Sequence, residues 1–183
     1  MKYFTAQLWA DINSPRSKAA CKEWDRNVAR YREHLKTVLP KMSARARWFF
    51  HEISLHDGTL TRMEVGDRIE DTEGKWERCN INRRKAGVRL SVLSADGDYV
   101  FRLEYKQVSR VEMSFPGKSL FPSGWDPNFG DWGYDEITEG SDGAFQHEVL
   151  FSSGATILIE FAKFTFNKSP AKPAPSGRKQ KAR

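Results

Sequence analysis

The sequence lacks the features that direct a protein into a membrane or out of the cell. In its 183 residues, no apolar run approaches the roughly 18 consecutive residues that a transmembrane helix needs. The opening Met1-Lys2-Tyr3-Phe4-Thr5 has no apolar stretch followed by small residues, which argues against a secretory signal. Only two cysteines occur, Cys21 and Cys79, and we expect them to be separate free thiols. These absences predict a cytoplasmic protein that does not bind membranes.

The sequence also lacks the spacings of common catalytic, metal and cofactor sites. It has no His-x-x-x-His, His-Glu-x-x-His or Cys-x-x-Cys pattern, no phosphate-binding or dinucleotide-binding glycine motif, and no Gly-x-Ser-x-Gly turn. We therefore expect no cofactor, no metal site and no enzymatic activity. The alternative is a hydrolase-like enzyme without a recognisable motif, and its candidate groups are His56-Asp57 or the set Asp126, Asp131 and Asp135. We interpret His56-Asp57 as part of a turn, because Asp-Gly commonly marks turns.

The net charge of +6 is unevenly distributed along the chain. Residues 1–60 carry 11 basic and 6 acidic residues, residues 61–166 carry 13 and 18, and residues 167–183 carry 6 and none. The high isoelectric point therefore comes largely from the last segment, and it is weak support for a nucleic-acid groove. That segment has no large apolar residue, so we expect 167–183 to be a disordered basic tail.

The first third of the chain has the apolar spacing of amphipathic helices. Ser14-Pro15 is typical of a helix start, and Pro40 predicts that this helix ends near Leu39. A second, shorter helix is expected from about Ser43, and it should end at the turn Leu55-His56-Asp57-Gly58. The apolar positions of the first helix recur at spacings of three and four: Cys21, Trp24, Val28, Tyr31, Leu35 and Val38.

From residue 59 the apolar period changes to two, which predicts strands. The segment Gly87–Phe115 contains two strands around Asp96-Gly97 and continues into a possible third strand. Trp76–Ile81 is a further candidate strand, and Phe145–Phe151 and Ala155–Phe166 form a second hairpin. We interpret His147-Glu148 as a cross-strand pair at the surface.

These patterns predict an α+β fold. An N-terminal helical pair packs on a mainly antiparallel sheet of about five to seven strands, with the helices on one face. Residues 1–58 are the helical segment, residues 59–166 are the sheet region of the same domain, and residues 167–183 are the tail.

Two surfaces are candidate binding sites. The loop between residues 116 and 133 is rich in glycine, proline and aromatic residues, and such loops are commonly functional. The alternative is that the loop folds its aromatics down as a lid over the sheet. Its candidate binding residues are Phe121, Trp125, Phe129, Trp132 and Tyr134. The second surface is a basic stripe on the first helix that faces a phosphate or an acidic partner, or is simply solvated: Lys18, Lys22, Arg26 and Arg30.

Three short features resemble a bacterial family of unknown function. They are the opening Met1-Lys2-Tyr3-Phe4-Thr5, the central Leu55-His56-Asp57-Gly58, and Trp132-Gly133-Tyr134-Asp135-Glu136 followed by Phe145-x-His147-x-x-Leu150-Phe151. The family has no known activity to transfer. The second and third features are also similar to β-rich proteins found beside bacterial toxin genes, and that resemblance implies an immunity-type protein.

The sequence therefore favours a non-enzymatic protein that recognises another protein. Nucleic-acid binding through the basic stripe and the basic tail is the alternative. The sequence leaves the oligomeric state open.

Overall fold

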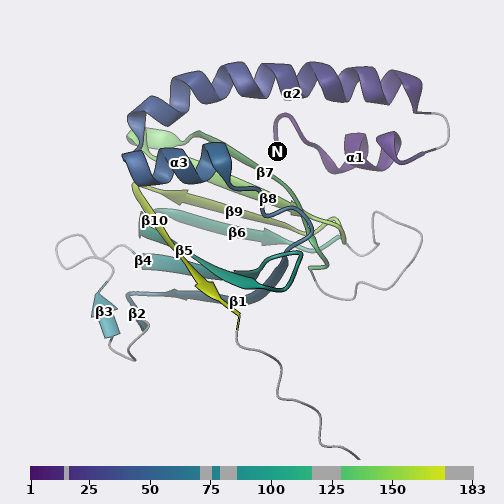
Figure 1. Cartoon of the computed structure of the whole chain (residues 1–183). Helices are drawn as coiled ribbons and strands as arrows, with labels where there is room; N and C mark the ends of the chain where they lie inside the picture. Colours follow the sequence, from purple (N-terminus) through teal and green to yellow (C-terminus); the bar gives the residue numbers. More distant parts are fainter. Residues whose placement is uncertain (15–16, 71–75, 79–85, 117–128, 172–183) are drawn as a thin grey trace, which may run out of the picture.

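A computed structural model describes residues 1–14, 17–70, 76–78, 86–116 and 129–171, and it shows helices lying over antiparallel sheets (Figure 1). The α+β class with antiparallel sheets is therefore confirmed. No helix in these ranges is long and apolar enough to cross a membrane. The helices are α1 (Ala6–Ile12), α2 (Lys18–Val38), the short 3-10 helix η1 (Leu39–Lys41), α3 (Ala44–Glu52) and the 3-10 turn η2 (Ser141–Gly143). The strands are β1 (Thr59–Gly66), β2 (Arg68–Glu70), β3 (Trp76–Arg78), β4 (Ala86–Leu93), β5 (Tyr99–Val108), β6 (Arg110–Ser114), β7 (Trp132–Glu139), β8 (Phe145–Phe151), β9 (Thr156–Phe161) and β10 (Lys163–Pro170).

The helix boundaries follow local sequence signals. α2 ends at Val38, two residues before Pro40, as the sequence predicts. It begins at Lys18 after Ser17, later than Ser14-Pro15 suggests, and Pro15 lies outside the described residues. α3 begins after Ser43, whose hydroxyl accepts a hydrogen bond from the Ala46 N–H.

Two long strand pairs join the sheets. One four-stranded sheet has the order β1-β4-β5-β10 and the other has the order β6-β9-β8-β7, while β2 and β3 form a separate ribbon. β5 continues into β6 and β9 continues into β10, so both strands pass from one sheet to the other. Hydrogen bonds at the crossing connect the Ser109 N–H to the Glu160 carbonyl and the Ala162 N–H to the Lys106 carbonyl. The two sheets therefore share one core.

A short backbone contact also links the outer strands β1 and β7. Thr59 and Asp131 form an isolated antiparallel bridge. Beside it, the Trp132 N–H donates to the Gly58 carbonyl at 2.7 Å, and the Asp57 N–H donates to the Trp132 carbonyl at 2.8 Å. The start of β1 is thus held to the start of β7, which places the turn after α3 against the second sheet.

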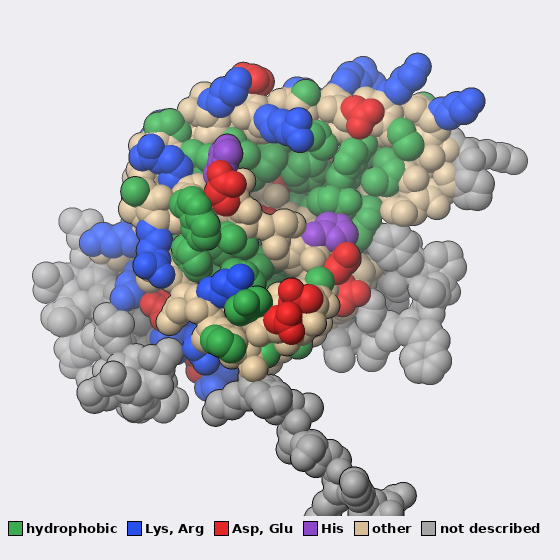
Figure 2. Space-filling model, viewed as in Figure 1, with side chains coloured by type: hydrophobic (Ala, Val, Ile, Leu, Met, Phe, Trp, Pro, Cys, Tyr) green, Lys and Arg blue, Asp and Glu red, His purple; other side chains and the backbone are tan. Residues whose placement is uncertain are grey.

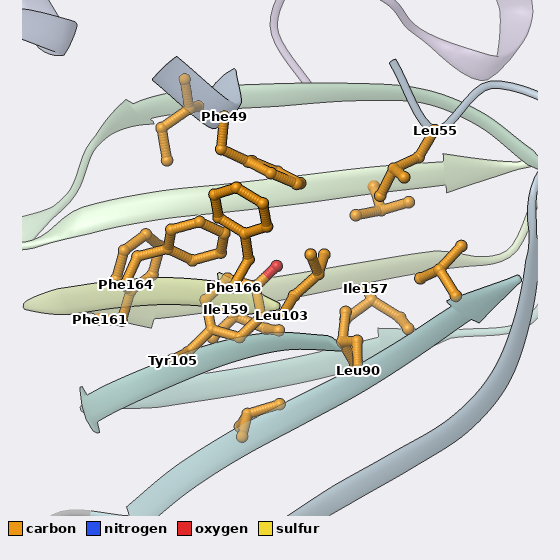
Figure 3. Packing of buried hydrophobic residues seen from close by; sticks show 14 of the residues in the cluster. Phe49, Leu55, Leu90, Leu103, Tyr105, Ile157, Ile159, Phe161, Phe164 and Phe166 are labelled. Carbon is orange, nitrogen blue, oxygen red and sulfur yellow. The ribbon is translucent and has the colours of Figure 1, made fainter. Parts of the chain in front are cut away.

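α3 covers the core where β10 lacks a further neighbour in its sheet. Phe49 lies 5.1 Å from the Phe164 ring and 4.8 Å from the Phe166 ring. Figure 3 shows Phe49 reaching down from α3 toward these rings and toward Tyr105 of β5. Burying such large aromatic side chains provides much of the free energy that holds the helix on the sheets.

The segment before α1 is anchored by a buried carboxylate. Glu136 of β7 is 1% exposed and accepts hydrogen bonds from the backbone N–H groups of Lys2, Tyr3 and Phe4 at 2.8, 2.6 and 2.6 Å. Asn27 of α2 donates its side-chain amide to the Tyr3 carbonyl at 3.0 Å. The backbone of this segment therefore joins β7 to α2 by hydrogen bonds to a side chain of each element.

His34 of α2 predicts a specific acid sensitivity. Its Nε2 is buried and has no hydrogen-bond partner among the described residues. Burial and, next, the positive charge of Lys2 lower the pKa of His34, while Glu139 and Glu136 oppose this shift. The unfolded chain takes up this proton below about pH 6.5, whereas the folded chain resists it, so folding loses stability as the pH falls.

We therefore expect the His34→Phe variant to lose less stability than the wild-type protein between about pH 7 and pH 5. Urea unfolding at both pH values measures the difference. His51→Phe, at an exposed histidine of α3, is the matched control. An unchanged pH dependence in the His34 variant would contradict this explanation.

Several details differ from the sequence-based expectation. The described residues contain three α-helices, because residues 6–12 form α1 ahead of the predicted helical pair. β6, the possible third strand of Gly87–Phe115, does not pair with β5 but pairs with β9 in the other sheet. The predicted strand Ala155–Phe166 is divided at Ala162. β10 extends to Pro170 because it pairs with β5, so residues 167–170 belong to the sheet, and 172–183 lie outside the described residues.

Candidate functional site

A groove lies between the C-terminal half of α2 and α3, and its volume is about 620 Å³. Its floor is apolar because α2 has an apolar stripe that faces α3. The sheet covers this stripe only in part. The rim carries positive charge from both helices. We call this site the α2–α3 groove. Its floor consists of Val28, Tyr31, Leu35, Leu39 and Pro40, and its rim consists of Arg32, Lys36, Arg47 and His51.

The helical surface around the α2–α3 groove is strongly basic. Residues 17–52 contain nine lysines and arginines and four acidic residues. Figure 2 shows basic side chains along α2 and around α3, with apolar side chains between the two helices. Lys36 forms a salt bridge with Glu33 at 2.7 Å. Within the described part of the chain, Arg32 and Arg47 have no ion-pair partner, so both guanidinium groups can bind an anionic group of a ligand.

The predicted basic stripe lies on the same helix, toward its N-terminus. Lys18, Lys22, Arg26 and Arg30 are all exposed. Arg26 forms a salt bridge with Glu23 at 2.5 Å. Arg30 donates to the Asn27 side chain at 3.4 Å, and its guanidinium lies 6.0 Å from the Tyr3 ring. Half of the stripe is therefore already engaged within the protein.

Sequence reasoning missed the cations of the α2–α3 groove. The signal was present as two pairs spaced by four residues, Arg32 with Lys36 and Arg47 with His51. Each pair places two basic groups on one helical face. Only the turn through η1, which contacts both α2 and α3, brings the two faces together around an apolar floor.

The aromatic loop is described only in part. Phe121 and Trp125 lie outside the described residues. Phe129 is half-buried, and its ring lies 4.8 Å from the Phe151 ring. Trp132 is fully buried, and Tyr134 packs among Phe4, Trp9, Trp24 and His56. The described aromatics of this loop therefore pack against other rings of the protein, and of these three only Trp132 is fully buried and presents no surface to a partner.

A chain of buried polar side chains crosses the core. The Tyr105 hydroxyl of β5 lies 2.7 Å from His147 Nδ1 of β8, and His147 Nε2 lies 3.1 Å from Asp135 Oδ2 of β7. Trp132 Nε1 donates to Asp135 Oδ1 at 3.0 Å. His147 is fully buried, so its interpretation as a surface residue paired with Glu148 is wrong. The strand pattern did not indicate this burial, because a histidine in such a pattern suggests a surface position. The hydrogen bonds on both ring nitrogens permit the histidine at a core position.

Asp135 is the one member of this chain whose side chain reaches solvent, with 31% of it exposed. Burial raises the pKa of the Asp135 carboxyl group. Hydrogen bonds from His147 and Trp132, together with the positive charge of histidine, outweigh burial and leave this pKa below its usual range. Asp135 therefore carries a negative charge at neutral pH.

The other candidate acidic and histidine groups lie at turns. His56 Nδ1 contacts Asp57 Oδ1 at 3.0 Å, and both side chains are exposed. Asp57 has a positive φ of 62°, which fits the predicted turn. Asp131 is exposed, and Asp126 lies outside the described residues. Within the described ranges, no group of three or more His, Cys, Asp or Glu side chains is arranged to hold a metal ion.

Compared with known proteins, the chain matches no protein-family model and no curated protein. The functional conclusion therefore depends on the geometry and charge of the α2–α3 groove and of the basic stripe on α2.

Proposed function

We infer that this protein recognises another protein, and that the α2–α3 groove receives an apolar segment of the partner that also carries acidic residues. The observation that carries this proposal is the combination of an apolar floor with a cationic rim. An apolar side chain of the partner would be desolvated on Leu35 and Leu39, while its carboxylates would pair with Arg32 and Arg47.

An apolar floor favours a protein over a nucleic acid as the partner. Nucleic-acid affinity comes mainly from cations that contact phosphates, and such contacts do not require an apolar cleft. The exposed stripe from Lys18 to Arg30 supports the nucleic-acid alternative, which would not depend on the α2–α3 groove. The two proposals therefore assign binding to different parts of α2.

Peptide selection tests the proposal without knowledge of the natural partner. We expect a displayed peptide library to yield sequences rich in Asp and Glu with Leu, Ile or Phe. The double variant Arg32→Glu/Arg47→Glu should bind them at least about tenfold more weakly, because two charge pairs become repulsive. The matched control Lys18→Glu/Lys22→Glu reverses the same number of charges on α2, outside the groove, and should bind normally.

Two results would contradict the proposal. The first is a selection that yields no acidic, apolar peptides. The second is an equal loss of binding in both double variants, which would indicate a general charge effect. Loss of DNA or RNA binding only in the Lys18/Lys22 variant would favour the nucleic-acid alternative.

The proposal has two finer parts. We place the protein in a reducing, cytoplasmic compartment, and the exposed free thiol of Cys21 supports this location. An immunity-type role, implied by the sequence resemblance, predicts a toxin gene beside the gene for this protein. If no toxin gene lies beside the gene for this protein, the immunity-type role is rejected. The proposal for the α2–α3 groove does not depend on that result.

A further inference from the structure

Both walls of the α2–α3 groove are helices, which pair their backbone groups internally. α2 spans Lys18–Val38 and α3 spans Ala44–Glu52, and Figure 1 shows that α3 runs back alongside the C-terminal half of α2. Because the hydrogen bonds of a helix lie within it, neither wall offers a free strand edge to which an extended peptide could add. A partner must therefore bind in this groove through its side chains.

The apolar floor of the groove also restricts the backbone of the partner. Tyr31 and Leu35 are half-buried and Leu39 is buried, so the floor offers few polar groups to a bound chain. A segment that lies on this floor loses water from the backbone groups that face it, and unpaired N–H and C=O groups in such a position are costly. An extended segment has no partner for these groups on the floor, whereas a helix pairs them internally. The floor therefore favours a helical segment.

The spacing of the floor residues matches the spacing of a helix that packs beside α2. Val28, Tyr31, Leu35 and Leu39 are separated by three, four and four positions. This row extends over roughly 16 Å, since a helix rises about 1.5 Å per residue. A second helix packed along such a row presents its own apolar residues at the same spacings. About three turns of a partner helix therefore cover the floor.

The rim determines the charge of such a helix. Arg32 and Lys36 are one helical turn apart on α2, and Arg47 and His51 are one turn apart on α3. Positive charge thus comes from both walls of the groove. A partner helix that matches this rim carries acidic residues on both sides of its apolar stripe.

The same charge argues against an occupant from this chain. A second copy that presented its own α2–α3 groove would place cations against cations. The residues after Ala171 carry five basic and no acidic residues and no large apolar side chain, so they match neither the rim nor the floor. The occupant with complementary charge is therefore a segment of a different protein.

We propose that the α2–α3 groove binds an amphipathic α-helix of another protein, about three turns long, whose apolar stripe is flanked by Asp and Glu. This inference rests on the function proposed above and specifies the conformation of the bound segment. The partner helix lies along α2 as a third helix beside α2 and α3. Its apolar side chains contact Tyr31 and Leu35, and its carboxylates pair with Arg32 and Arg47.

Two capped peptides of about 14 residues test the conformation, because they share one composition of Leu, Glu and Ala and differ only in order. In the first peptide the leucines recur at spacings of three and four, and in the second leucine alternates with glutamate as in a strand. We expect the first peptide to bind at least about tenfold more tightly in calorimetric titration and to gain helical circular dichroism on binding. The Arg32→Glu/Arg47→Glu variant should lose this binding, and the matched Lys18→Glu/Lys22→Glu variant should keep it.

This proposal is overturned if the two peptides bind equally, if the alternating peptide binds more tightly, if the first peptide binds without a gain of helix, or if neither peptide binds. In each of these cases the function proposed above still stands when peptide selection yields acidic, apolar sequences that need Arg32 and Arg47. If the selection also fails, both proposals are rejected. A dimer of the protein alone that Arg32→Glu/Arg47→Glu abolishes would identify a second copy as the occupant and would also overturn the proposal.

Discussion

Replacing Trp132 with alanine should lower the free energy of unfolding by about 3–5 kcal/mol, the range for removal of a buried tryptophan. Its side chain is fully buried and lies 5.6 Å from the Phe151 ring. Alanine would leave a cavity and would also remove a hydrogen bond to Asp135. The same residue makes the backbone contacts that hold β7 to the start of β1. Urea unfolding followed by circular dichroism measures the loss.

Trp48→Ala is the matched control for this prediction. Trp48 is 51% exposed on α3, where its ring stacks on Phe166 at 5.8 Å. Its replacement should cost about 1 kcal/mol or less, because little buried area is lost. Equal losses in the two variants would show that Trp132 is not the support that its burial indicates.

Replacing Glu136 with alanine should cost about 3 kcal/mol or more, because three backbone N–H groups lose their acceptor at once. Glutamine keeps one acceptor oxygen and should cost clearly less. One Glu136 oxygen accepts from both Tyr3 and Phe4, so a single retained oxygen can preserve two of the three hydrogen bonds. Urea unfolding ranks the two variants.

Glu139→Ala provides the control, because Glu139 is an exposed β7 carboxylate paired only with Lys41 in the described part of the chain. Exposed pairs of this kind contribute little to stability, because water and salt screen them. A loss for Glu136→Ala no larger than that for Glu139→Ala would mean that the hydrogen bonds to Glu136 do not hold the segment before α1 in place.

The sequence predicted the elements better than their arrangement. The apolar spacing from Trp24 to Val38 and the turn at Asp96-Gly97 are local signals, and the structure contains the helix and the hairpin that they predict. The pairing of β6 with β9 is not local, because it depends on a strand that leaves one sheet for the other. No short-range pattern identifies such a change of partner.

The candidate site was predicted less well, for physical reasons. Aromatic residues near position 132 were compatible both with an interface and with a lid packed over the sheet, because large aromatics are also the residues that bury the most area. His147 stands in a strand pattern where a polar residue suggests a surface position, yet its partners Tyr105 and Asp135 come from two other strands. The α2–α3 groove required the relative placement of two helices, which residue spacing within one helix does not encode.

The continuity of β5 with β6 and of β9 with β10 has a consequence for how the protein folds. Each sheet contains part of both long strands, so the two sheets are joined by continuous backbone and not by long loops. The contact between Thr59 and Asp131 joins segments that are far apart in the chain. Contacts of this kind raise the contact order, and a high contact order slows folding. The sheets therefore form one cooperative unit, which the contact between the start of β1 and the start of β7 closes.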